Sequence, residues 1–231
     1  MSNLDFSLVL GAEFRGWLLG GFNLSLLLTV LTLLLAMPLA TVVALCRVSP
    51  SAALRGLGFA FVEGVRSVPL LAHLLFWYFA APELLPGPAR QWLYDHHAET
   101  LCALVALTLY TAAYLSEDLR SGLRAVPSAQ LEAGRSLGFG HLATMRRIVL
   151  PQAFRIAVPP LISQTLNLWK NTSIATVIGA AELMYQAQRV ESASFRGVET
   201  FVVATLAYLS VSMLITGLSV WYQRRHPAGG A

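Results

Sequence analysis

Long uncharged stretches alternate with short charged segments along this chain. No Asp, Glu, Lys or Arg stands between Arg15 and Arg47. A helix needs about 20 mostly apolar residues to cross the hydrocarbon core of a membrane. This stretch therefore predicts a membrane-spanning helix over Leu24–Leu45, and a similar stretch before Arg224 predicts another over Phe201–Tyr222.

Three further apolar stretches are shorter or less pure. Leu101–Ser116 is uncharged, whereas Leu57–Ala81 and Ala153–Ile178 each contain two charged side chains. Backbone groups in lipid must be hydrogen-bonded internally, and the alternation of a spanning β-barrel is absent, so helices are the remaining choice. The sequence predicts an all-α polytopic membrane protein with about five transmembrane helices, in a single domain over residues 1–231.

Composition supports a membrane protein and argues against a soluble one. Hydrophobic residues make up 56% of the chain and charged residues 12%, whereas soluble domains carry about 25% charged residues. The net charge of +4 is what basic loops on one membrane face produce, and it does not indicate nucleic-acid binding.

The basic residues divide unequally between the two faces that five spans define. Lys and Arg concentrate in cytoplasmic loops. We therefore expect the richer face to be cytoplasmic, with the amino terminus outside and the carboxyl terminus inside. We expect no removable signal peptide, because Asp5 and Glu13 stand in the first segment, which lacks a basic start. With Arg66 and Lys170 inside spans, the richer face holds Arg47, Arg55, Arg120, Arg124, Arg135, Arg146, Arg147, Arg155, Arg224 and Arg225, and the other holds Arg15, Arg90, Arg189 and Arg196.

The longest cytoplasmic segment is predicted over 117–151. A helix is expected to start near Pro127 and Ser128, to be interrupted at Gly138-Phe139-Gly140, and to resume until Pro151 stops it. Two short helices at an angle would result. Leu137, Phe139 and Leu142 can offer an apolar face to a partner groove. The alternative is a solvated amphipathic helix whose arginines contact lipid headgroups.

Glu63 and Arg66 are charged residues inside the second predicted span. Charges within a membrane generally face the protein interior or a water-filled path. They stand one helical turn apart and can therefore pair with each other. An internal salt bridge and a role in a translocation path both stay open.

The sequence Lys170-Asn171-Thr172-Ser173 is the second polar cluster inside a span. Its ammonium, amide and hydroxyl groups can compensate the charge of a passing carboxylate. The alternative is hydrogen bonding between helices, which membrane proteins commonly use.

Catalytic and metal-binding patterns are absent from the sequence. There is no G-x-x-x-x-G-K-[ST] loop for ATP, no G-x-S-x-G elbow and no H-E-x-x-H pair. His96 and His97 are adjacent, so their imidazoles point in different directions and do not predict a metal site. We expect no enzyme activity and no cofactor in this chain. An energy-driven process would need a separate subunit that binds ATP and Mg²⁺.

The charged segment resembles the cytoplasmic EAA loop of ABC importer permeases. The resemblance rests on Glu132-Ala133-Gly134, Gly138 and Ile148-Val149-Leu150-Pro151, with Gly134 where Ala is usual. Over nearly the whole chain the sequence is similar to permeases for polar amino acids, of the histidine, glutamine and glutamate/aspartate type. The segments that carry this similarity are Val62–Leu70, with Ser67-Val68 where Gly-Thr is frequent, Tyr114–Arg120, Gln152–Phe154 and Lys170–Gly179.

The resemblance implies an ABC importer type I permease fold in a bacterial inner membrane. It implies that Glu132, Ala133, Gly134, Leu137, Gly138, Phe139, Leu150 and Pro151 couple the chain to a cytoplasmic ATP-binding subunit. It also implies an identical or related second permease subunit, an external solute-binding protein and surrounding membrane lipid as partners. Glu83–Pro86, Val158–Leu161 and Asn167–Asn171 look most like a glutamate/aspartate permease. The rival hypothesis is a membrane scaffold or sensor that recruits a soluble partner without transport.

Overall fold

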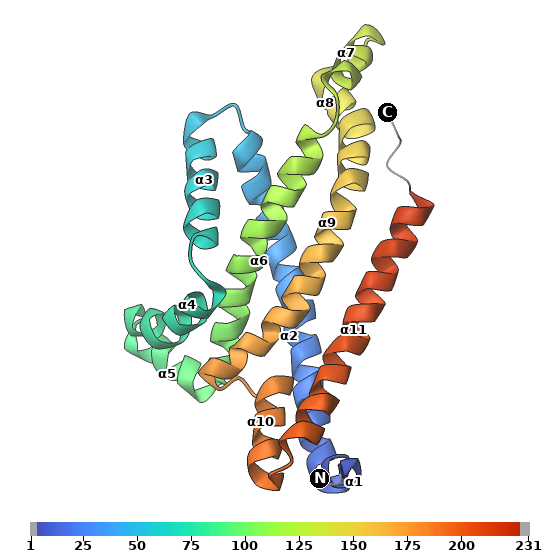
Figure 1. Cartoon of the computed structure of the whole chain (residues 1–231). Coiled ribbons are helices and arrows are strands. Elements are labelled where there is room, and N and C mark those ends of the chain that lie inside the picture. Colours follow the sequence, from blue (N-terminus) through green and yellow to red (C-terminus); the bar gives the residue numbers. More distant parts are fainter. Residues whose placement is uncertain (1–3, 227–231) are drawn as a thin grey trace.

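The computed structural model describes residues 4–226, so the first three and last five residues of the predicted domain lie outside the described residues. Every regular element in the described range is helical (Figure 1). The α-helices are α1 (Phe6–Val9), α2 (Ala12–Val48), α3 (Ala52–Arg66), α4 (Leu70–Leu75), α5 (Gly87–Asp95), α6 (Ala98–Arg124), α7 (Ser128–Ser136), α8 (His141–Thr144), α9 (Leu150–Asn171), α10 (Leu183–Ser194) and α11 (Gly197–Arg225). Two π-helical turns, η1 (Phe76–Ala80) and η3 (Met145–Val149), and two 3-10 helices, η2 (Ala81–Leu84) and η4 (Thr172–Ile178), complete the set.

Three helices in the described range, α2, α6 and α11, are long and apolar enough to cross a membrane. They contain the predicted spans and extend beyond them at both ends. With 37 residues, α2 rises about 55 Å, which exceeds the hydrocarbon thickness of about 30 Å. It passes through Pro38 without ending.

The predicted second span is broken rather than continuous. The chain bends by 99° between α3 and the segment Leu70–Leu84, so the predicted span over Leu57–Ala81 is divided into two helical parts. Pro69 lacks an N–H and disfavours helical conformation at Val68, which explains the position of the break. The ring of His73 fixes the corner by a hydrogen bond at 3.0 Å to the Val65 carbonyl.

The predicted span over Ala153–Ile178 corresponds to α9 and η4. Figure 1 shows α9 between α6 and α11, and it packs on both. Pro151 was predicted to stop a helix. It lies instead in the first turn of α9. The preceding turn η3 is widened to π-helix, a local adjustment that passes the chain into α9. Pro159 and Pro160 both lie inside α9.

Both ends of the bundle carry short helices. Figure 1 shows α1 and α10 at one end, and α7, α8 and the end of α11 at the other. The segment that leads from the broken second span to α6 is largely helical, as η2 and α5. Leu183, Ala187 and Val190 of α10 pack in a buried cluster with residues of α1, α2 and α11.

Helix α6 lies at the centre and contacts α2, α3 and α9. Small side chains let the helices approach closely. A Cβ on Gly122 would lie 2.7 Å from the Ala153 carbonyl oxygen. Only glycine fits there, so α6 and α9 approach closely at this point.

Candidate functional site: a helical hairpin and a polar cavity

Helices α7 and α8 form a hairpin that begins, as predicted, after Pro127. Gly138 adopts a φ of +80°, which glycine reaches without steric cost. The Phe139 N–H donates to the Gly134 carbonyl at 3.0 Å, and the Gly138 N–H donates to the Arg135 carbonyl at 2.9 Å. These bonds end α7 with a left-handed turn of the kind that commonly closes helices. The interruption predicted at Gly138 is therefore confirmed.

Gly134 lies at the contact between the two arms of the hairpin. It is buried, and a Cβ placed on it would lie 2.6 Å from Thr144 Cγ2 and 3.1 Å from Ile148 Cδ1. Real Cβ atoms essentially never approach another atom to 2.6 Å. The glycine at the position where alanine is usual is therefore matched to the bulk of Thr144 in this chain.

The tip of the hairpin exposes apolar side chains. Leu137 is 73% exposed and Leu142 is 80% exposed. Phe139 is partly buried, with the Arg147 guanidinium 5.7 Å from the centre of its ring. Glu132 and Ala133 are exposed on α7. The hairpin thus combines a rigid, hydrogen-bonded turn with an uncovered apolar tip.

Leu150 and Pro151 lie apart from that tip, at the start of α9. Leu150 borders an apolar groove of about 320 Å³ formed with α2 and α6, which Leu45 and Leu123 also line. Of the residues that the resemblance assigns to coupling, these two occupy the base of the hairpin and the other six its α7 arm and turn.

A polar cavity of about 370 Å³ opens between α6 and α9. The Tyr110 hydroxyl donates to the Tyr114 hydroxyl at 3.2 Å. The Asn167 amide donates to Gln164 at 3.4 Å. The lining residues are Tyr110, Tyr114, Gln164, Asn167, Lys170 and Asn171. Polar and ionisable side chains within a spanning region generally face the protein interior or a water-filled cavity rather than lipid.

Lys170 and Arg66 supply positive charge to this region. Lys170 is exposed, and no ion pair involving it occurs among residues 4–226. Arg66 ends α3, and its guanidinium lies 4.8 Å from the centre of the Tyr114 ring. The break after α3 therefore directs Arg66 to the cavity lined by α6.

The salt bridge considered for Glu63 and Arg66 is not formed in the described part of the chain. Glu63 is exposed and does not line the cavity. Arg66 instead interacts with Asp118, which also interacts with Gln164. Of the charged pair singled out in the sequence, only Arg66 belongs to this site.

Thr172 and Ser173 bond within their own helix. The Thr172 hydroxyl is buried and donates to the Trp169 carbonyl at 2.8 Å. The Ser173 hydroxyl donates to the Lys170 carbonyl at 2.7 Å. The structure therefore brings Lys170 and Asn171 to the cavity and leaves these two hydroxyls as local helix contacts.

Sequence reasoning missed four lining residues, of which Tyr110 and Tyr114 come from α6 and Gln164 and Asn167 from α9. Their spacing of three or four residues places each pair on one helix face. That spacing could have indicated a polar face on each of the two helices. Another missed residue is Glu117, which accepts from Arg120 Nε at 3.0 Å and lies 3.4 Å from Arg47 Nη2. This cluster ties α6 to α2 and neutralises the Glu117 carboxylate.

Comparison with known proteins gives consistent matches. Residues 21–226 match the family model for the binding-protein-dependent transport system inner membrane component. The chain is 31% identical over 216 residues to the glutamate/aspartate import permease protein GltJ of Escherichia coli (strain K12), covering 92% of this chain and 88% of that protein. It is 38% identical over 193 residues to the probable glutamine ABC transporter permease protein GlnM of Bacillus subtilis (strain 168), covering 84% and 85%. The crystal structure of an amino acid ABC transporter with histidines is similar at a TM-score of 0.85 and 26% identity, covering 96% of this chain and 99% of that one.

Proposed function

Because this chain belongs to the family of binding-protein-dependent transport system inner membrane components, we propose that it forms the translocation path of an ATP-driven importer for a polar amino acid. The observation that carries the proposal is the polar cavity between α6 and α9, with Lys170 on its wall and Arg66 beside it. An amino acid presents a carboxylate and an ammonium group. The two cations suit the carboxylate, and the hydroxyl and amide oxygens suit the ammonium.

The narrower proposal is glutamate or aspartate as substrate. An acidic amino acid carries a second carboxylate, and the region offers a second cation. Glu117 is engaged by Arg47 and Arg120, so Asp118 is the carboxylate left to oppose Arg66 and Lys170. A positive surplus disfavours a cationic substrate and favours an anionic one. The similarity to both a glutamate/aspartate permease and a glutamine permease makes these the substrates to compare.

The α7–α8 hairpin is the proposed contact with an ATP-binding subunit that holds ATP and Mg²⁺. Its exposed Leu137 and Leu142 would enter a groove of that subunit. Closure of two such subunits would draw two hairpins together and turn the cavity outwards. ATP then shifts the population between inward-open and outward-open states through different contacts in each.

The remaining partners and the orientation follow from this role. A second permease chain, identical or related, would complete the wall of the cavity, and an external solute-binding protein would deliver substrate. The hairpin end of the bundle would face the cytoplasm of a bacterial cell, with α1 and α10 facing outwards. This orientation agrees with the distribution of arginines between the two faces.

Uptake into proteoliposomes tests the proposal. The chain is reconstituted with an ATP-binding subunit and a solute-binding protein from the same organism, and labelled glutamate, aspartate and glutamine are compared. We expect ATP-dependent accumulation, with the acidic substrates preferred. Loss of a charge-assisted hydrogen bond costs about 1.5–3 kcal/mol, so Lys170→Gln should raise KM at least about tenfold.

Arg155→Gln is the matched control, because Arg155 is an exposed cation on the same helix that does not line the cavity. It should transport like the unchanged chain. Absence of ATP-dependent accumulation of any amino acid would favour the scaffold or sensor hypothesis. An equal effect of Lys170→Gln and Arg155→Gln would remove the cavity from the path.

A further inference from the structure

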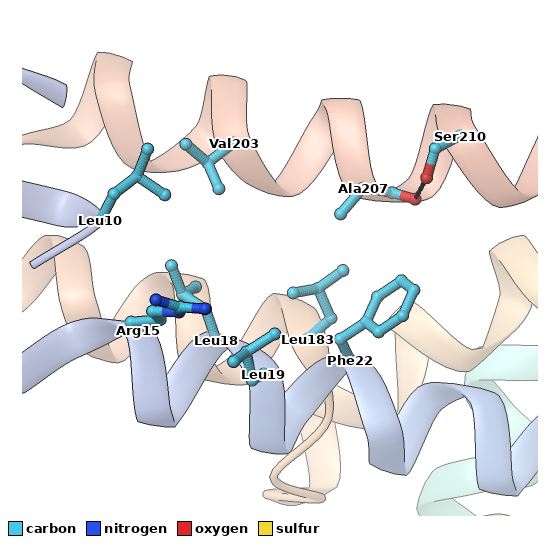
Figure 2. Close-up of a pocket in the computed structure, with 9 residues that line it drawn as sticks. All are labelled: Leu10, Arg15, Leu18, Leu19, Phe22, Leu183, Val203, Ala207 and Ser210. Atoms are coloured by element: carbon cyan, nitrogen blue, oxygen red, sulfur yellow. Dashed lines mark hydrogen bonds between the residues drawn. The ribbon is translucent and has the colours of Figure 1, made fainter. Parts of the chain in front are cut away.

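A second cavity, of about 460 Å³, lies between α2 and α11 near the end of the bundle that holds α1 (Figure 2). Helix α10 packs on both α2 and α11. Figure 2 shows side chains from α2 facing Val203 and Ala207 across an open groove. The groove is lined by Leu10, Arg15, Leu18, Leu19, Phe22, Leu183, Val203, Ala207 and Ser210.

The walls of this groove are apolar apart from one charge. The Ser210 hydroxyl donates to the Ala207 carbonyl at 2.8 Å, so its hydrogen is used within α11. Arg15 is exposed, and its side chain makes no hydrogen bond or ion pair within residues 4–226. A nearby cation, Arg189, is engaged over the Trp17 ring at 3.8 Å. Arg15 is therefore the charge available to a ligand in the groove.

The positions of the lining residues give the groove a polar mouth and a closed inner end. Arg15 lies beside Trp17, a residue type enriched at the headgroup level of membranes. Phe22 lies seven residues further along α2, which corresponds to about 10 Å. Its ring packs edge-on against Trp169, with 5.9 Å between centres, and the Trp169 indole donates to the Tyr208 carbonyl at 3.0 Å. These aromatic rings close the groove towards the bundle interior.

We propose that this groove binds one acyl chain of an anionic phospholipid whose phosphate contacts the Arg15 guanidinium. An apolar slot suits a hydrocarbon chain and excludes a polar amino acid, so this site is separate from the α6–α9 cavity. The unpaired cation at its mouth complements a phosphate, and a guanidinium can contact two phosphate oxygens at once. The bound chain would fill the space that α10 leaves between α2 and α11, and would stabilise their spacing.

Native mass spectrometry of the purified transporter complex containing the full chain tests this site. Phosphatidylglycerol and phosphatidylcholine with identical acyl chains are the probes. The unchanged protein should retain phosphatidylglycerol about fivefold more strongly, because one basic residue near the headgroups contributes about that factor. Arg15→Gln should abolish the preference. Arg124→Gln, a matched exposed arginine at the opposite end of the bundle, should keep it.

A variant that fills the groove separates the acyl chain from the headgroup. Leu19→Trp adds a ring at an exposed groove position and should lower retention of both lipids, while the yield of monodisperse complex confirms folding. Equal retention of the two lipids by the unchanged protein would overturn the proposal, as would an unchanged preference in Arg15→Gln. A symmetric cross-link between two copies carrying Leu19→Cys would show that a second permease chain covers the groove, which also overturns it.

Discussion

Gly134 and Thr144 meet where α7 crosses the start of the second hairpin arm, and a Cβ on Gly134 would lie 2.6 Å from Thr144 Cγ2. The Thr144 hydroxyl also donates to the Gly140 carbonyl at 3.1 Å, which fixes the orientation of its methyl group. These two residues therefore set the distance between the arms of the proposed coupling hairpin.

Gly134→Ala should impair coupling even though alanine is usual at this position in the EAA loop. Overpacking of this kind lowers the free energy of unfolding by about 1–3 kcal/mol, and it would displace α7 from α8. We expect a several-fold fall in substrate transported per ATP hydrolysed, measured by parallel uptake and ATPase assays in proteoliposomes.

Thr144→Ser added to Gly134→Ala should restore coupling, because it removes the colliding methyl group and keeps the hydroxyl. Gly140→Ala is the matched control, since a Cβ there meets nothing within 4 Å. Normal coupling in Gly134→Ala alone would show that the spacing of the arms is not critical.

The Tyr114 ring should matter for transport through its contact with Arg66. Tyr114→Leu removes the ring beneath the guanidinium, and a cation–π contact contributes about 0.5–2 kcal/mol. Tyr114→Phe keeps the ring and loses only the hydroxyl contact to Tyr110. We expect KM for uptake to rise several-fold more in Tyr114→Leu than in Tyr114→Phe. Equal KM values in the two variants would argue against the contact with Arg66.

Glu182 should be the most stabilising carboxylate at the end of the bundle that holds α10. It is fully buried and accepts hydrogen bonds from the Tyr208 hydroxyl at 2.7 Å and the Ser25 hydroxyl at 3.2 Å. It also accepts from the backbone N–H groups of Met184 at 3.0 Å and Tyr185 at 2.9 Å. The carboxylate thus joins α2, α10 and α11 at one point.

Glu182→Gln should lower the thermal unfolding temperature in detergent. The new amide NH₂ group is a donor and cannot accept the hydrogen bonds that the carboxylate oxygen accepts. An unsatisfied buried polar group lowers the free energy of unfolding by about 1–3 kcal/mol. Glu83→Gln serves as the comparison, because it breaks an exposed pair with Arg90 of a kind that contributes little. Equal unfolding temperatures for the two variants would contradict the structural role of Glu182.

The long helices could be predicted from the sequence because charge-free runs of this length have few other structures available in a membrane. Local patterns also located the hairpin and its glycine. A bend at Pro69 could be predicted from the proline, but its angle of 99° could not, since that angle depends on backbone geometry.

The polar cavity could be predicted only in part. Lys170 and Asn171 were conspicuous because polar groups are rare inside spans. Tyr110 and Gln164 belong to different helices, and no local pattern places them together. Helical spacing left open whether Arg66 pairs with Glu63 or faces a path, and the contact of Arg66 with the Tyr114 ring on another helix could not be read from that spacing.

The accessibility of a cysteine at position 167 tests most directly whether the α6–α9 cavity is the translocation path. Asn167 is exposed and lines this cavity. Asn167→Cys is labelled in proteoliposomes with a membrane-impermeant thiol reagent applied to one face at a time, after Cys46 has been replaced by serine. We expect labelling from the hairpin face without ATP, labelling from the opposite face with ATP and the loaded binding protein, and protection by substrate. Labelling that ignores ATP and substrate, or a cysteine that neither face can reach, would contradict this role of the cavity.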